Sequence, residues 1–97
     1  MDINDVLDYK LTGRLDSQTA GYHEAELLSL MDACVDGITV DMSGVTHLST
    51  AGIRILLLVS RAYQAKDMKF VVHSLPPAVA EVVRITGLAE LLTFRST

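Results

Sequence analysis

Two neighbouring hydroxyl residues, Ser49 and Thr50, stand where a strand is expected to lead into a helix. We interpret Val40–Val59 as the end of a buried strand, a turn at Ser43-Gly44, a short polar segment and a strongly apolar helix. At such a junction the amides of the first helical turn point outward and the helix dipole favours negative charge. The pattern therefore predicts a place for a phosphate, although a Ser-Thr pair before a helix also serves as an ordinary N-cap.

No catalytic or metal-binding pattern accompanies these hydroxyls. His23, His47 and His73 lack metal-ligand spacing, and His47, expected on the surface of the same turn, has no third residue to orient it as a base. The sequence has neither a G-x-S-x-G elbow nor a glycine-rich nucleotide loop. Because a threonine hydroxyl is a poor nucleophile without help, we predict that the chain is not an enzyme and needs no metal or cofactor.

Length and composition predict one domain, residues 1–97, with an aliphatic core. Hydrophobic residues make up 49% of the chain but aromatic ones only 5%, and Trp is absent. This composition disfavours a carbohydrate-binding platform and a base-stacking surface. Cys34 is the only cysteine, which excludes an internal disulfide and predicts a buried structural thiol.

The charge pattern argues against nucleic acid and membrane partners. Twelve acidic and eight basic residues give a net charge of -4, and the basic residues are scattered along the sequence. The longest unbroken apolar run, Ile55–Val59, is too short to span a bilayer, and the first residues are acidic where a signal peptide needs a basic one. We therefore expect a cytoplasmic protein that does not insert into a membrane.

Apolar periodicity predicts that strands and helices alternate along the chain. The expected elements are strands over Val6–Leu15, Gly37–Met42 and Met68–His73, and helices from an Asp16-Ser17 cap to near Gly37, over Ala51–Lys66, and from Pro77 to Gly87. This alternation implies βαβ crossovers. The predicted fold class is therefore α/β, with helices packed against a parallel or mixed sheet.

Apolar positions indicate which side of each helix faces the core. The second helix is apolar over more than half its circumference, including Leu58, and its wetter side carries Arg54, Arg61, Gln64 and Lys66. The residues expected to face inward from the first and third helices are Ala20, Leu27, Leu30, Met31, Cys34, Val79, Val82, Val83 and Thr86. The residues expected to close the tail against the core are Leu88, Leu91, Leu92 and Phe94.

Three separated motifs resemble those of one protein family. The segment DMSGVTHLSTAGIRILL, residues 41–57, resembles the signature of STAS domains, specifically the stand-alone bacterial anti-sigma factor antagonists of the SpoIIAA type. Gly13-Arg14-Leu15-Asp16 with Thr19-Ala20 is similar to the family's G-x-L-D-x-x-T-A, and Thr86-Gly87-Leu88 to its late T-G-L. The resemblance implies a small, largely parallel sheet with helices mainly on one face. Relatives carry a longer amino-terminal strand, where this chain has only Met1–Asp5.

The resemblance also implies a regulated role for the central motif. By position, Thr50 matches the residue that is phosphorylated in the family, and Ser49 is the second candidate. The unphosphorylated protein is then expected to bind a GHKL-type anti-sigma factor kinase and thereby free a sigma factor. Phosphorylation would end that binding, and a PP2C-type phosphatase would restore it.

A partner surface is expected around Thr50. Asp16 and Asp41 are both predicted at strand ends, which a parallel sheet would bring to the same rim, although Asp16 also suits a helix cap and Asp41 a solvated strand end. Arg54, one turn after Thr50, can pair with a phosphate or with an acidic partner, or be an ordinary exposed arginine. The predicted partner-binding residues are Asp16, Asp41, Ser43, Ser49, Gly52, Ile53 and Arg54.

A non-switching role is the main alternative. STAS domains also serve as small interaction subunits of lipid-transport ABC systems, in which the helix after this turn docks on a permease, and as other scaffolds. Thr50 and Arg54 favour the switch without excluding the scaffold.

Overall fold

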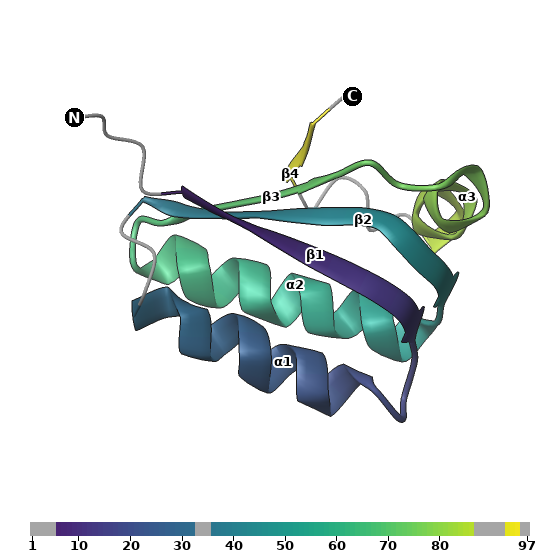
Figure 1. The fold of residues 1–97 in the computed structure, drawn as a ribbon, viewed down its shortest axis with the longest axis horizontal. Coiled ribbons are helices and arrows are strands. Elements are labelled where there is room, and N and C mark those ends of the chain that lie inside the picture. Colours follow the sequence, from purple (N-terminus) through teal and green to yellow (C-terminus); the bar gives the residue numbers. More distant parts are fainter. Residues whose placement is uncertain (1–5, 33–35, 87–92, 96–97) are drawn as a thin grey trace.

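The computed structural model describes residues 6–32, 36–86 and 93–95, with side chains for those up to Ile85. Its elements are β1 (Val6–Leu15), α1 (Ala20–Ser29), the 3-10 turn η1 (Leu30–Asp32), β2 (Gly37–Leu48), α2 (Thr50–Ala65), β3 (Lys69–His73), α3 (Pro77–Thr86) and β4 (Thr93–Arg95). The sheet order is β1-β2-β3-β4, and each of these neighbouring pairs is parallel. The α/β class with helices mainly on one face is confirmed, because α1 and α2 lie side by side under the sheet (Figure 1).

The second strand is twice as long as the sequence predicted. We placed a turn at Ser43-Gly44, but β2 continues through it to Leu48. With twelve residues, β2 is two residues longer than β1, which has ten. Two register shifts between the strands accommodate this difference, one between Lys10 and Thr12 and one between Gly13 and Arg14. Gly44 permits the first shift, because a Cβ there would lie 2.8 Å from the Thr12 methyl. His47 consequently lies in a strand and not in a turn.

These irregularities curve the outer half of β2 toward the start of α2 (Figure 1). Gly13, predicted to allow a bulge or bend, has a φ of +81°, a conformation that favours glycine. The curved end of β2 carries α3 on the side away from α1 and α2 (Figure 1). The junction between β2 and α2 therefore lies at one corner of the molecule, with helices near it on both sides.

The core between the sheet and the two long helices is aliphatic, as predicted. Its fully buried members include Leu11, Leu15, Leu27, Ile38, Val40, Met42, Ile53, Val59 and Val72. The main aromatic exception is Tyr63, whose hydroxyl donates a hydrogen bond to the Leu27 carbonyl at 2.6 Å and so joins α2 to α1. Leu58, which the sequence pattern assigned to the apolar part of α2, is nevertheless 47% exposed.

The first helix begins later and ends earlier in the chain than its sequence pattern suggested. Asp16 and Ser17 lie in a turn, and Thr19 is the N-cap residue, without a side-chain capping bond. The helix ends at Ser29 and passes into η1, whereas we predicted an end near Gly37. Ala20 and Leu27 are buried as expected, Leu30 and Met31 are partly buried, and Cys34 lies outside the described residues.

The third helix begins at Pro77, as predicted, because proline suits the first turn of a helix. Val79 and Val83 are buried and Val82 is partly buried. The predicted positions Gly87, Leu88, Leu91 and Leu92, the side chains of Thr86 and Phe94, and the amino-terminal Met1–Asp5 lie outside what the structure describes. The short strand β4, paired with β3, was not predicted from the sequence.

Within the described ranges, no helix has the length and apolar character needed to cross a bilayer.

Candidate functional site at the start of helix α2

The carboxyl ends of β1 and β2 lie side by side and bring two chain segments to one rim. Leu15 and Leu48, the last residues of these strands, are paired in register. Directly beyond them, the Ser49 amide donates to the Leu15 carbonyl at 3.0 Å. The turn that leads into α1 and the start of α2 are therefore neighbours, although they are more than thirty residues apart in the sequence.

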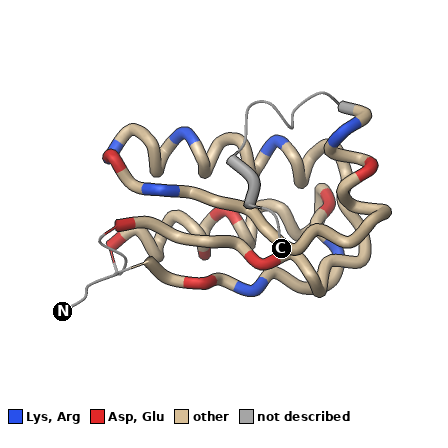
Figure 2. Tube along the Cα trace, turned by 90° about the horizontal axis from the view of Figure 1, so that it is seen from above, with Lys and Arg blue, Asp and Glu red and all other residues tan. Residues whose placement is uncertain are grey.

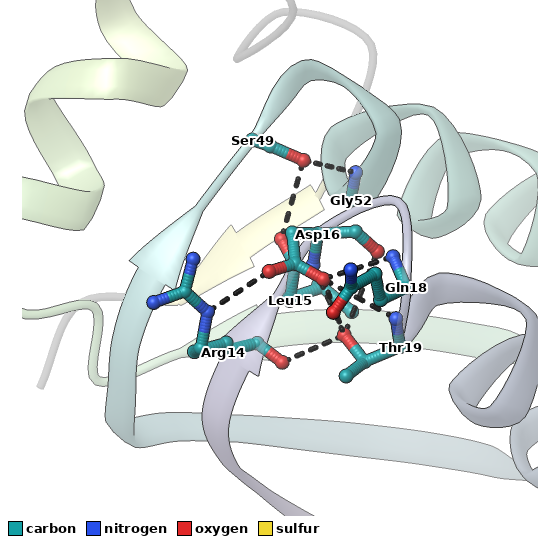
Figure 3. Close-up of polar contacts among 7 residues, drawn as sticks. All are labelled: Arg14, Leu15, Asp16, Gln18, Thr19, Ser49 and Gly52. Carbon is teal, nitrogen blue, oxygen red and sulfur yellow. Dashed lines mark hydrogen bonds and ion pairs between the residues drawn. The ribbon is translucent and has the colours of Figure 1, made fainter.

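Ser49 caps α2 and is held in place by its own hydroxyl. It has an extended backbone, with φ -102° and ψ 172°, and its Oγ accepts a hydrogen bond from the Gly52 amide at 3.3 Å. The same Oγ donates to the Leu15 carbonyl at 3.5 Å (Figure 3). The Ser49 hydroxyl is therefore used to fasten the helix start to β1.

Thr50, the first residue of α2, is exposed. Its hydroxyl makes no hydrogen bond to another residue in the part of the chain that the structure describes. Ser49 already provides acceptors for the amides of Gly52 and Ile53, so those of Thr50 and Ala51 have no acceptor among the described residues. A free hydroxyl and two free amides thus meet at the positive end of the helix dipole.

Two predicted partner-binding residues instead support this helix start from inside. Gly52 is buried against β1, and a Cβ at this position would lie 2.5 Å from the Leu15 carbonyl oxygen and 2.7 Å from Leu15 Cγ. Ile53 is completely buried in the core. Because both positions are buried, neither residue can contact a partner directly with its side chain.

Asp16 lies at the rim, as expected, in a closed set of hydrogen bonds. Its Oδ2 accepts from Arg14 Nε at 2.9 Å, and its Oδ1 accepts from the amides of Gln18 at 3.0 Å and Thr19 at 3.3 Å (Figure 3). The Arg14 hydrogen bond, followed by that from Gln18, holds the pKa of Asp16 below its ordinary value. The alternative that Asp16 caps the helix is wrong, because its carboxylate binds amides of the turn before α1 and Thr19 is the N-cap residue.

Asp41 does not lie at the rim. It is paired with Lys10 and His73 in the middle of β2. Because a strand rises about 3.3 Å per residue, the seven residues from Asp41 to Leu48 place them roughly 23 Å apart along the strand. The Ser43 amide donates to Asp41 Oδ1 at 2.9 Å and lowers the pKa of that carboxyl. The strand-end prediction for Asp41 is wrong because β2 does not end at Met42, and Ser43 moves away from the rim with it.

A second polar cluster, not anticipated from the sequence, lies on the sheet face opposite the two long helices. His73 is 7% exposed, and its Nε2 lies 3.1 Å from Asp8 Oδ1. Thr39 Oγ1 donates to the same Asp8 oxygen at 2.6 Å, and this hydrogen bond, followed by that from His73, lowers the pKa of Asp8. These contacts join β1 to β3 across β2, so the cluster is a structural fastening.

Comparisons with known proteins identify the family. Residues 2–97 match the family model of the STAS domain. The chain belongs to the STAS domain family. One relative of this STAS domain is a Bordetella bronchiseptica protein named "Putative anti-sigma factor antagonist BtrV", which is 30% identical over 89 residues that cover 92% of this chain and 77% of that protein.

Solved structures show that the fold is shared. A serine-to-glutamate variant of RsbS from Moorella thermoacetica matches with a TM-score of 0.77 and 22% identity, over 100% of this chain and 84% of that one. The anti-sigma factor antagonist SpoIIAA in its unphosphorylated form matches with a TM-score of 0.75 and 18% identity, over 98% and 84%. At these identities the likeness establishes the fold alone.

The candidate site of this STAS domain thus contains fewer residues than the sequence predicted. Thr50, Ser49 and Asp16 meet at the rim, and exposed Arg54 follows one turn after Thr50. Sequence reasoning missed Arg14 and Thr19, which hold Asp16 and the turn in place, because neither lies in the central motif. Their place in the G-x-L-D-x-x-T-A segment was the available signal.

Proposed function

We propose that this STAS domain is a cytoplasmic anti-sigma factor antagonist that acts by partner switching at Thr50. With Thr50 unmodified, it binds a GHKL-type anti-sigma factor kinase, and the sigma factor held by that kinase is freed. The kinase ends the interaction by phosphorylating Thr50, and a PP2C-type phosphatase reverses the modification. The observation that carries the proposal is the exposed, unbonded hydroxyl of Thr50 beside a Ser49 hydroxyl that is already used.

The named relatives support this role. The Bordetella protein is named as an anti-sigma factor antagonist, and the structural relative SpoIIAA carries the same description with its phosphorylation state stated. Thr50 also occupies the position that the family resemblance assigns to the acceptor.

The local structure explains how a phosphate can be added without unfolding the protein. Phosphorylation adds about -1.5 to -2 charges and three acceptor oxygens. The free amides of Thr50 and Ala51 and the helix dipole favour that charge. The nearby carboxylate of Asp16 is already paired with Arg14. We therefore expect the cost to fall on a bound partner, which would have to desolvate the dianion.

The decisive experiment incubates the protein with the anti-sigma factor kinase of its own organism and ATP, and locates the phosphate by mass spectrometry. We expect transfer to Thr50 and none to Thr50→Ala. Thr46→Ala is the matched control, since Thr46 is an exposed hydroxyl residue four positions away on β2 and should leave transfer unchanged. Thr50→Glu should weaken kinase binding.

Two results would contradict the proposal. One is modification at another residue, or none, by a kinase that is active on a control substrate. The other is unchanged kinase binding by Thr50→Glu. Recovery of a membrane permease together with an unmodified Thr50 would favour the non-switching subunit of a lipid-transport ABC system.

A further inference from the structure

One side of helix α2 is exposed to solvent along most of the length of the helix. Thr50, Arg54, Leu58 and Arg61 are all exposed, and Leu58 is 47% exposed although it is a leucine. At about 100° per residue, these four positions fall within an arc of roughly 80°, opposite the side of the helix that is buried. We call these four residues the α2 stripe.

The α2 stripe is basic in an otherwise acidic protein. From Ser49 to Lys66 the chain has Arg54, Arg61 and Lys66 and no acidic residue, whereas the whole chain has a net charge of -4 (Figure 2). The neighbouring region Ala20–Asp32 shows the opposite pattern, with three acidic residues and no Lys or Arg. Neither Arg54 nor Arg61 makes an ion pair within the described ranges. Two unpaired guanidinium groups thus flank an exposed leucine.

We propose that the α2 stripe is the docking surface for an acidic amphipathic helix of the partner. The proposal rests on the proposed function and names the surface that the anti-sigma factor kinase uses. Arg54 and Arg61 are seven residues apart, which is about two helical turns or roughly 10 Å. Two carboxylates at the same spacing on a partner helix would meet them, with an apolar side chain between them over Leu58.

The position of Thr50 at one end of the α2 stripe gives phosphorylation a second way to act. Thr50 and Arg54 are an i, i+4 pair, so their side chains lie on one helix face within reach of each other. A phosphate on Thr50 would pair with Arg54 and withdraw it from the partner's carboxylate. The same phosphate would repel that carboxylate directly. Phosphorylation of Thr50 therefore adds negative charge at this end of the α2 stripe and also neutralises the positive charge of Arg54.

Charge reversal along α2 tests the proposal. The affinity of the cognate kinase is measured by calorimetry for wild type, Arg54→Glu, Arg61→Glu and Leu58→Ser. Each variant should bind the kinase about tenfold or more weakly than wild type. The two glutamates would repel the partner's carboxylates, and Leu58→Ser would remove the apolar contact between them. The loss for the two charge variants should shrink at high salt. The matched control is Lys66→Glu, the same change of charge at the C-cap residue of α2, and it should change affinity less than about threefold. At about 100° per residue, Lys66 lies roughly 80° to 160° around the helix axis from the four residues of the stripe.

A phosphorylated sample tests the coupling to Thr50. If the phosphate acts partly by capturing Arg54, phosphorylation should weaken kinase binding by a smaller factor in Arg54→Ala than in wild type. All variants should retain the wild-type circular dichroism spectrum and melting temperature, because the changed side chains are exposed.

The results separate this inference from the proposed function. If Thr50 is phosphorylated but the stripe variants bind the kinase as well as Lys66→Glu does, the stripe is overturned and the switch stands. If the stripe variants lose binding while Thr50 is not modified, the stripe stands and the switch fails. Unchanged kinase binding with a loss of binding to phosphatidylglycerol vesicles would assign the stripe to a membrane and overturn the proposal.

Discussion

Two helices start at the same rim of this molecule, and their first residues are organised in opposite ways. The turn into α1 carries a carboxylate, Asp16, which accepts hydrogen bonds from two amides and pairs with Arg14. The start of α2 carries a neutral cap, Ser49, which serves one amide with its hydroxyl and leaves the amides of Thr50 and Ala51 without an acceptor among the described residues. The turn into α1 thus has a carboxylate bound to its amides, whereas two amides at the start of α2 remain available to an anion.

This difference shows where a regulatory charge can be added. Negative charge is favourable near a helix start, and the turn before α1 already holds the carboxylate of Asp16, which is paired with Arg14. At α2 such a charge is missing, and an exposed hydroxyl stands where a phosphate would supply it. Negative charge is thus a fixed part of the structure before α1, whereas at the start of α2 it would depend on phosphorylation. Substitutions at each of the two positions test this difference.

The largest effect is expected at Gly52. In Gly52→Ala the new Cβ would meet the Leu15 carbonyl at 2.5 Å, so the start of α2 would have to move away from β1. We expect the free energy of unfolding to fall by about 3 kcal/mol, as in other overpacked cores. Urea denaturation measures it.

The matched control is Gly21→Ala at the start of α1, where nothing lies within 4 Å of the new Cβ. Because alanine favours a helix over glycine, this variant should be more stable by about 0.5–1 kcal/mol. Equal destabilisation by both substitutions would show that the close contact of α2 with β1 does not hold the site.

The next effect separates the two hydroxyls. Ser49→Ala removes the cap of α2 and should lower the free energy of unfolding by about 1 kcal/mol. Thr50→Ala removes an exposed hydroxyl without a partner among the described residues and should change it by less than about 0.5 kcal/mol. The same denaturation measurement compares them. A larger loss from Thr50→Ala than from Ser49→Ala would mean that the structural and regulatory hydroxyls have been assigned the wrong way round.

The sequence predicted the alternation of three strands with three helices, because each of these elements had its own periodicity and its own end signals. It failed at Ser43-Gly44, where a pair typical of turns lies inside a strand. A bulge accepts that pair because β1 provides Thr12 next to the glycine, and this pairing between distant residues cannot be seen in a local pattern. The displacement of Asp41 from the rim follows from that one error.

Sequence also located the candidate site but not the division of labour within it. The motif placed Ser49 and Thr50 together, yet which hydroxyl is free depends on the Leu15 carbonyl, which reaches Ser49 from another strand. Leu58 shows the same limit, because hydrophobicity alone predicts burial, and only the arrangement of α1, α2 and the sheet reveals that its side of α2 is uncovered.

The smallest effect concerns the charge at the start of α1. The pKa of Asp16 is lowered in the folded protein, chiefly by the Arg14 hydrogen bond. Its contribution to stability is therefore present above the ordinary aspartate pKa of about 4 and is lost as the pH falls through the lower folded value. The effect should be small because Arg14 is largely exposed, with 62% of its side chain accessible.

Asp16→Asn isolates that contribution, because asparagine can still accept the Gln18 and Thr19 hydrogen bonds but cannot form the ion pair with Arg14. We expect the difference in unfolding free energy between wild type and Asp16→Asn to shrink between about pH 5 and pH 2. Asp8 and Asp41, whose pKa values are also lowered, are present in both proteins and cancel in this difference. A difference that stays constant over this range would show that Asp16 acts only as a hydrogen-bond acceptor, and the start of α1 would then be as neutral in its energetics as the start of α2.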